Sequence, residues 1–121
     1  MDEPIVDPSH PLIVKRLQPD ERVHTVVQTA SASLFITDRR VAVAAAERIA
    51  LDVPFEGLRR IQFDIERQRP ATLVLVPEHR SDEPQVLAVP RSHYAQVAAA
   101  LATIGERLYD IGHSEGSTDS A

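Results

Sequence analysis

The sequence predicts a mainly β domain, a β-sandwich or partly open barrel of about seven antiparallel strands closed by one C-terminal amphipathic α-helix. Short runs of alternating apolar residues recur between residues 22 and 89, and turn-forming residues separate them. After Pro90 the apolar period changes from two residues to about 3.6, the period of a helix. No helical pattern separates the strands, which excludes parallel β-α-β units.

The domain is predicted to span residues 12–111. Residues 1–11 contain three prolines and no apolar period, and they are predicted to be a flexible leader. The segment that follows, residues 12–17, can form a short helical turn that Pro19 ends.

Four strands are predicted in the first half of the domain. Residues 22–29 form the first, a valine-rich run with threonines. A hairpin follows, in which two β-prone runs flank Thr37–Arg39, and an aspartate there accepts backbone hydrogen bonds that stabilise a tight turn. Val41 and Val43 share one face of the strand after this turn. The fourth strand, residues 49–53, alternates in the same way.

Three more strands are predicted before the helix. In residues 58–66, Ile61, Phe63 and Ile65 are predicted on one face and polar residues on the other, so that one face is buried and the other exposed to water. Residues 72–76 are apolar on both faces, as expected for a central strand. Residues 86–89 form the last, short strand.

The C-terminal helix is predicted at about residues 92–110. Its apolar residues form one stripe along the helix: Tyr94, Val97, Ala98, Leu101, Ile104 and Leu108. Ser92 is the predicted N-cap and Gly112 the residue that ends the helix. The remaining residues, 112–121, are predicted to be a disordered tail.

Composition limits the function. The chain has 13 basic and 18 acidic residues, whereas nucleic-acid binders usually have a basic excess. It has no cysteine, no apolar run of about 20 residues and an acidic N-terminus unlike a secretory signal, so we expect a cytoplasmic protein. Lys15 is the only lysine, and arginine-rich, alanine-rich usage is typical of GC-rich bacterial genomes.

No catalytic or metal-binding pattern emerges. The serines lack the Gly-x-Ser-x-Gly setting of a hydrolase nucleophile. The five histidines are scattered, and no pair has the helical spacing of metal ligands. We therefore expect no enzyme activity, no metal and no cofactor.

Two segments resemble the bacterial pleckstrin-homology-like and GRAM-like families. Glu21–Val23 followed by Leu34–Val41 resembles their opening pattern E-x-V … L-x-I-T-D-x-R, and residues 53–61 resemble the segment between their fourth and fifth strands. The resemblance covers about residues 12–108 and implies a bent seven-stranded sandwich capped by a helix. It implies little about function, because this fold hosts lipid, peptide and protein binders alike.

The resemblance also places a lipid site, which the charges disfavour. Lipid-binding members gather cations on the first two strands and the loop joining them, but here that loop, residues 29–32, has none. Residues 47–48 and 78–83, expected at the same end, hold two arginines and four acidic residues. Binding of an anionic lipid is therefore disfavoured.

Six arginines are predicted to gather at the opposite end of the domain: Arg39, Arg40, Arg59, Arg60, Arg67 and Arg69. They form a candidate site for an acidic partner segment or a phosphate-bearing ligand. The alternative is that they are ordinary turn residues, each paired weakly with a nearby carboxylate.

A second candidate is a self-association strand, formed by Val41, Ala42, Val43 and Ala44. Because it is apolar on both faces, either the chain itself or a second subunit must cover it. A curled sheet also offers an exposed edge, or the groove between its fifth strand and the helix, for a partner strand. We therefore expect a non-enzymatic protein-interaction or assembly module that forms homo-oligomers. The alternative is a membrane- or phosphate-ligand-binding module that uses the arginines.

Overall fold

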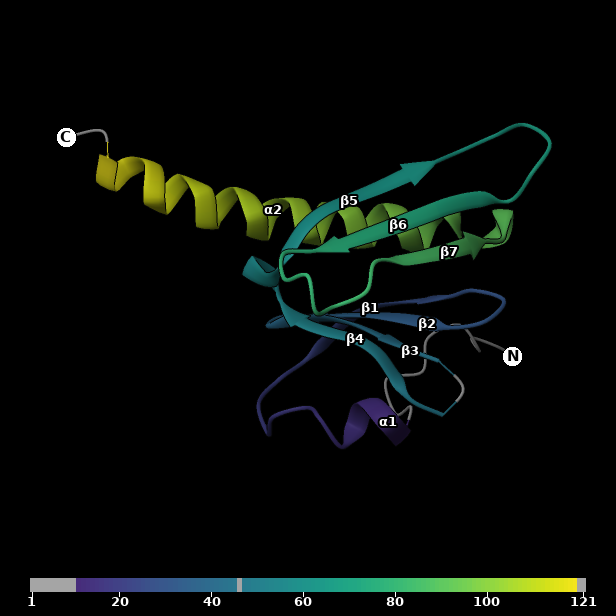
Figure 1. The fold of residues 1–121 in the computed structure, drawn as a ribbon, viewed down its shortest axis with the longest axis horizontal. Helices are drawn as coiled ribbons and strands as arrows, with labels where there is room; N and C mark the ends of the chain where they lie inside the picture. Colours follow the sequence, from purple (N-terminus) through teal and green to yellow (C-terminus); the bar gives the residue numbers. More distant parts are fainter. Residues whose placement is uncertain (1–10, 46, 120–121) are drawn as a thin grey trace.

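The computed structural model describes residues 11–45 and 47–119 and contains two antiparallel sheets (Figure 1). The first sheet has the order β1 (Val23–Gln28), β2 (Ser33–Thr37), β3 (Arg40–Ala44) and β4 (Ile49–Pro54). The second has the order β5 (Leu58–Asp64), β6 (Ala71–Pro77) and β7 (Gln85–Val89). A single 3-10 turn, η1 (Phe55–Gly57), connects the two sheets. The predicted mainly β fold with seven strands is confirmed.

The main core lies between the two sheets and α2 (Tyr94–Asp119). Leu34 and Ile36 of the first sheet and Leu73 of the second are fully buried in it. The helix contributes Val97 and Ile104, both 0% exposed. Burying each such side chain contributes about 1.5–3 kcal/mol, so α2 is bound to the sheets mainly by its apolar stripe.

One position of the predicted helix stripe is wrong. Ala98 is exposed, whereas Ala100 is 1% exposed and packs in the core. Tyr94, Leu101 and Leu108 are partly buried against the core, as the stripe predicted.

A smaller core covers the outer face of the first sheet. The helix α1 (Pro11–Val14) places Ile13 over Ala42 and Ala44, and Leu17 packs at its border. Ile13 and all four residues of the predicted self-association strand are at most 2% exposed. The chain itself therefore covers this strand, which leaves no free surface on it for a second subunit.

The ends of the helix differ from the prediction. Ser92 does not cap α2 but lies in a 3-10 turn, η2 (Arg91–His93), that precedes it. Gly112 does not end the helix, which continues to Asp119 through most of the predicted tail. A glycine inside a helix costs only about 1 kcal/mol, so it permits a stop without enforcing one. The predicted leader lies, apart from Pro11, outside the described residues, as do residues 120–121 of the tail.

Candidate functional site

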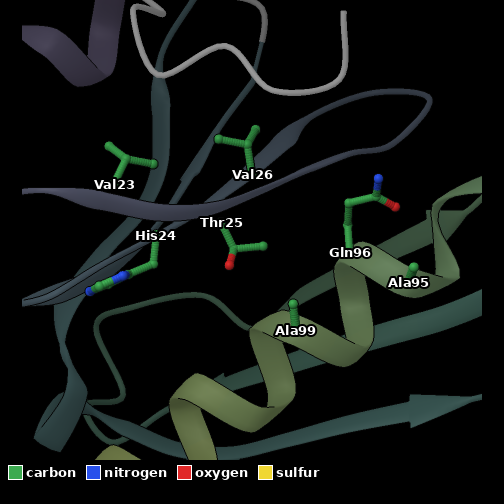
Figure 2. A pocket seen from close by; sticks show the side chains of 7 residues that line it. All are labelled: Val23, His24, Thr25, Val26, Ala95, Gln96 and Ala99. Atoms are coloured by element: carbon green, nitrogen blue, oxygen red, sulfur yellow. The ribbon is translucent and has the colours of Figure 1, made fainter. Parts of the chain in front are cut away.

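A groove of about 280 Å³ lies between β1 and the first turns of α2 (Figure 2). Its lining residues come from these two elements only: Val23, His24, Thr25, Val26, Ala95, Gln96 and Ala99. Thr25 points toward the helix, whereas Val23 and Val26 point away from it and pack in the smaller core (Figure 2). The helix side is lined by Ala95, Gln96 and Ala99, and His24 is the only one of the seven lining residues that can carry a charge. The groove is thus suited to an uncharged side chain of a partner.

Gln96 gives the groove a polar feature. Its Oε1 atom is buried and is the one buried side-chain acceptor without a hydrogen bond among the described residues. An unsatisfied buried acceptor costs about 1–3 kcal/mol, and such groups in folded proteins call for an explanation. Because the atom is buried, a donor on a bound partner would remove this cost once the Gln96 side chain turns toward the groove.

The edge of β1 beside the groove is closed to strand addition. The Thr29 amide donates to the Ala32 carbonyl at 2.9 Å, so these two residues form a hydrogen-bonded pair. Because hydrogen-bonded and non-hydrogen-bonded pairs alternate along antiparallel strands, the backbone groups of Val26 and Gln28 point away from β2. Val26 is only 1% exposed. The Gln28 carbonyl already accepts a hydrogen bond from His93 Nδ1, at 2.8 Å. The predicted exposed edge for a partner strand is therefore not found here.

Arg40 and Glu21 form the centre of a polar cluster at the β2–β3 turn. Arg40 donates from Nε to Glu21 Oε2 at 2.8 Å and from Nη2 to Oε1 at 2.9 Å. Glu21, whose side chain is 0% exposed, also accepts from Thr37 Oγ1 at 2.6 Å and from the Gln18 amide at 3.0 Å. Burial raises the pKa of Glu21, but these hydrogen bonds outweigh it and hold the pKa below its ordinary value.

Asp52 extends the cluster to the N-terminal segment. Its carboxylate pairs with Arg40 at 3.3 Å and with Arg16 at 3.0 Å. Arg39 pairs with Asp20 at 2.8 Å, and the Arg39 guanidinium lowers the pKa of that carboxyl. Both arginines of the turn are therefore paired with carboxylates of the segment before β1, and Arg40, the more buried of the two, holds that segment against the hairpin.

The structure does not bring the six predicted arginines together. Arg39 lines a hollow with Arg107 of α2, whereas Arg67 and Arg69 line another with Tyr94. Tyr94 and Arg107 lie about 20 Å apart along the helix. The predicted gathering at one end is therefore wrong.

Arg59 and Arg60 line neither of these two hollows. Both are exposed at the start of β5, and among the described residues neither forms an ion pair.

Sequence reasoning missed Arg91, which joins Arg67 and Arg69. The three line a hollow of about 340 Å³ together with Gln68, Pro70, Pro90 and Tyr94. Tyr94 is held there by an edge-to-face contact with Phe63, with ring centroids 5.4 Å apart. Only the position of Arg91 directly after Pro90, at the start of the helix, could have indicated it.

The acidic β6–β7 loop does not lie at the same end of the domain as the β1–β2 loop, contrary to the prediction. The Glu78 amide donates to the Gly57 carbonyl at 2.9 Å, so this loop starts beside η1. The β1–β2 loop instead lies next to Ala44 and Ala45 and is tied to η2 through Gln28. The acidic loop therefore does not repel anions at the β1–β2 end, although that loop itself remains without a cation.

No protein-family model and no curated protein matches the chain, but two solved structures resemble it. One is a DUF1696 family protein with a pleckstrin-homology domain from Shewanella loihica PV-4: TM-score 0.61, 14% identity, 78% of this chain and 85% of that chain covered. The other is a pleckstrin homology domain from Shewanella amazonensis SB2B: TM-score 0.57, 15% identity, 78% and 89% covered.

Within the described residues, no helix is long and apolar enough to cross a bilayer. The likeness to GRAM-like domains stays a prediction. At identities this low, what the two solved structures share with this protein is its architecture, and the chain has the pleckstrin-homology-like fold that its sequence predicted.

Proposed function

We propose that this protein is a non-enzymatic protein-interaction module whose groove between β1 and α2 takes a side chain of a partner protein. The observation that carries the proposal is the unsatisfied Gln96 Oε1 in a groove whose other polar lining residues are His24 and Thr25. An apolar pocket with a few placed polar groups is the usual form of a recognition site. The partner's apolar side chain would gain contacts, and a donor beside it would bond to Gln96 Oε1 once that side chain turns toward the groove.

Peptide selection tests this proposal. Twelve-residue peptides displayed on phage are selected on the immobilised protein, and their affinities are then measured by fluorescence anisotropy. Ala99→Phe fills the groove from an exposed helix position, and we expect it to weaken binding at least tenfold. Ala102→Phe, at an exposed helix position outside the groove, is the matched control and should change nothing. Selected peptides that bind both variants equally would refute the groove as the site.

The alternative, a membrane- or phosphate-ligand-binding module, is now supported by the hollow of Arg67, Arg69 and Arg91 alone. Co-sedimentation with phosphatidylserine vesicles at low and high salt tests it. Salt-sensitive binding that is lost in Arg67→Glu/Arg69→Glu would favour this alternative over the protein-interaction module.

A further inference from the structure

Two hollows flank the first turn of α2. Ala95 and Gln96 face the groove beside β1, and Arg91 and Tyr94 line the arginine hollow on the other flank. The hydrogen bond from His93 to the Gln28 carbonyl fixes the turn between the hollows against β1. Both hollows are therefore held at defined positions on either side of η2, and one bound segment can contact both.

The arginine hollow has uncompensated positive charge. Of its three arginines only Arg69 has an ion pair within the described residues, with Glu66 at 3.7 Å, and both of those side chains are more than half exposed. Such a pair is weak. Arg67 and Arg91 have no carboxylate partner in the part of the chain that the structure describes. The hollow therefore attracts an anionic group.

Nothing at the start of the helix offsets this charge. Neither η2 nor the first turn of α2 contains an acidic residue, and no side chain caps η2. The positive end of the helix dipole thus adds to the charge of the arginines.

We propose that the partner segment that fills the groove is acidic, with one or two Asp or Glu residues at the end that crosses η2 to Arg67, Arg69 and Arg91. The inference rests on the proposed function of the groove and names the chemistry of its partner. Arg91 and Ala95 are four residues apart across η2 and the start of α2, a rise of roughly 6–8 Å. An extended chain advances about 3.3 Å per residue, so two or three residues span this rise.

The test uses charge reversal of Arg91. Peptides selected on the wild-type protein should carry Asp or Glu at one end, and raising NaCl from about 50 to 500 mM should weaken their binding. Arg91→Glu should lower their affinity at least tenfold, and selection on that variant should yield Lys or Arg at the same positions. Arg59→Glu, which reverses an exposed arginine at the start of β5, is the control and should leave affinity unchanged. Thermal melts confirm that each variant is folded.

The outcomes separate the two proposals. Peptides that lose affinity with Ala99→Phe but show no acidic preference would overturn this inference and leave the groove function standing. Peptides insensitive to Ala99→Phe would overturn both. Phosphatidylserine vesicles that bind the wild-type protein but not Arg91→Glu, with no peptide competing, would assign the arginines to lipid and overturn the inference. A second copy of the chain as the occupant would appear as a dimer in light scattering that Ala99→Phe abolishes, which would also overturn it.

Discussion

Arg40 binds Glu21 through two parallel hydrogen bonds of 2.8 and 2.9 Å, across 19 positions of the sequence. Thr37, between them in the chain, donates to the same carboxylate and accepts from the Arg40 amide at 2.9 Å. These three residues stand at the E, T and R of the pattern that resembles the bacterial pleckstrin-homology-like families. In this protein that pattern therefore fixes a turn, and the resemblance it carries is one of fold.

Arg40→Leu should lower the free energy of unfolding by about 3 kcal/mol, because it leaves the buried Glu21 carboxylate without its cation. Urea denaturation at pH 7 measures the change. Arg60→Leu, at an exposed position, should cost no more than about 0.5 kcal/mol. Equal effects of the two substitutions would show that the ion pair contributes nothing beyond a surface arginine.

Stability should fall on the acid side because of Glu21. Its pKa in the folded protein is lower than the ordinary value of 4.5, so the unfolded chain binds a proton more readily. The stabilisation is present above pH 4.5 and is lost as the pH falls through the lower, folded pKa. Denaturation between pH 7 and pH 3 should show a steeper loss for wild type than for Glu21→Gln. The exposed Glu106→Gln should keep the wild-type slope.

Gly105→Ala should stabilise the protein by about 0.5–1 kcal/mol, because alanine is the better helix former. A Cβ at Gly105 would meet no atom within 4 Å, whereas one at Gly57 would lie 3.1 Å from the Val53 Cβ. Gly57→Ala should therefore be neutral or destabilising. Melting temperatures of the two variants check this pair, and a lower melting temperature for Gly105→Ala would contradict it.

Ile13→Ala should destabilise the protein by about 2–5 kcal/mol and increase its self-association. Ile13 is 2% exposed and covers Ala42 and Ala44 of the apolar sheet face. Its neighbour Val14, 48% exposed, is the matched control, and Val14→Ala should cost little. Light scattering measures the association. A destabilised Ile13→Ala that stays monomeric would mean that uncovering this face does not drive association.

Gln96→Leu should have opposite effects on stability and binding. Removing the buried, unsatisfied Oε1 should raise the free energy of unfolding by about 1 kcal/mol. Peptides selected on the wild-type protein should bind this variant more weakly. A residue with only a structural role would not lose binding as stability rises, so the two measurements together test its role.

The local sequence pattern was enough to predict the strands, but not which side chains of different strands come into contact. The predicted strand at 49–53 became Ile49–Pro54, and that at 72–76 became Ala71–Pro77, because alternation is a property of neighbouring residues. The pairing of Arg40 with Glu21 depends instead on how β1 and β3 flank β2. The charge of an isolated arginine gives no sign of the carboxylate that tertiary folding brings to it.

The candidate site was least predictable for the same reason. Arg91 joins Arg67 and Arg69 only because the chain after β7 returns to the β5–β6 loop. Gln96 is the only polar residue in the stretch 95–102, which is a weak signal in the sequence. Its meaning depends on being buried without a partner, and that follows from the packing of α2 against β1.

Tyr94, whose ring contacts Phe63, gives the protein its own fluorescent reporter. The chain has no tryptophan and two tyrosines, so its ultraviolet emission comes from Tyr94 and Tyr109. Tyr94 lines the arginine hollow, and Tyr109 lies four turns along the same helix. Tyr109→Phe would leave a single emitter at the hollow, through which ligand binding can be followed without a label.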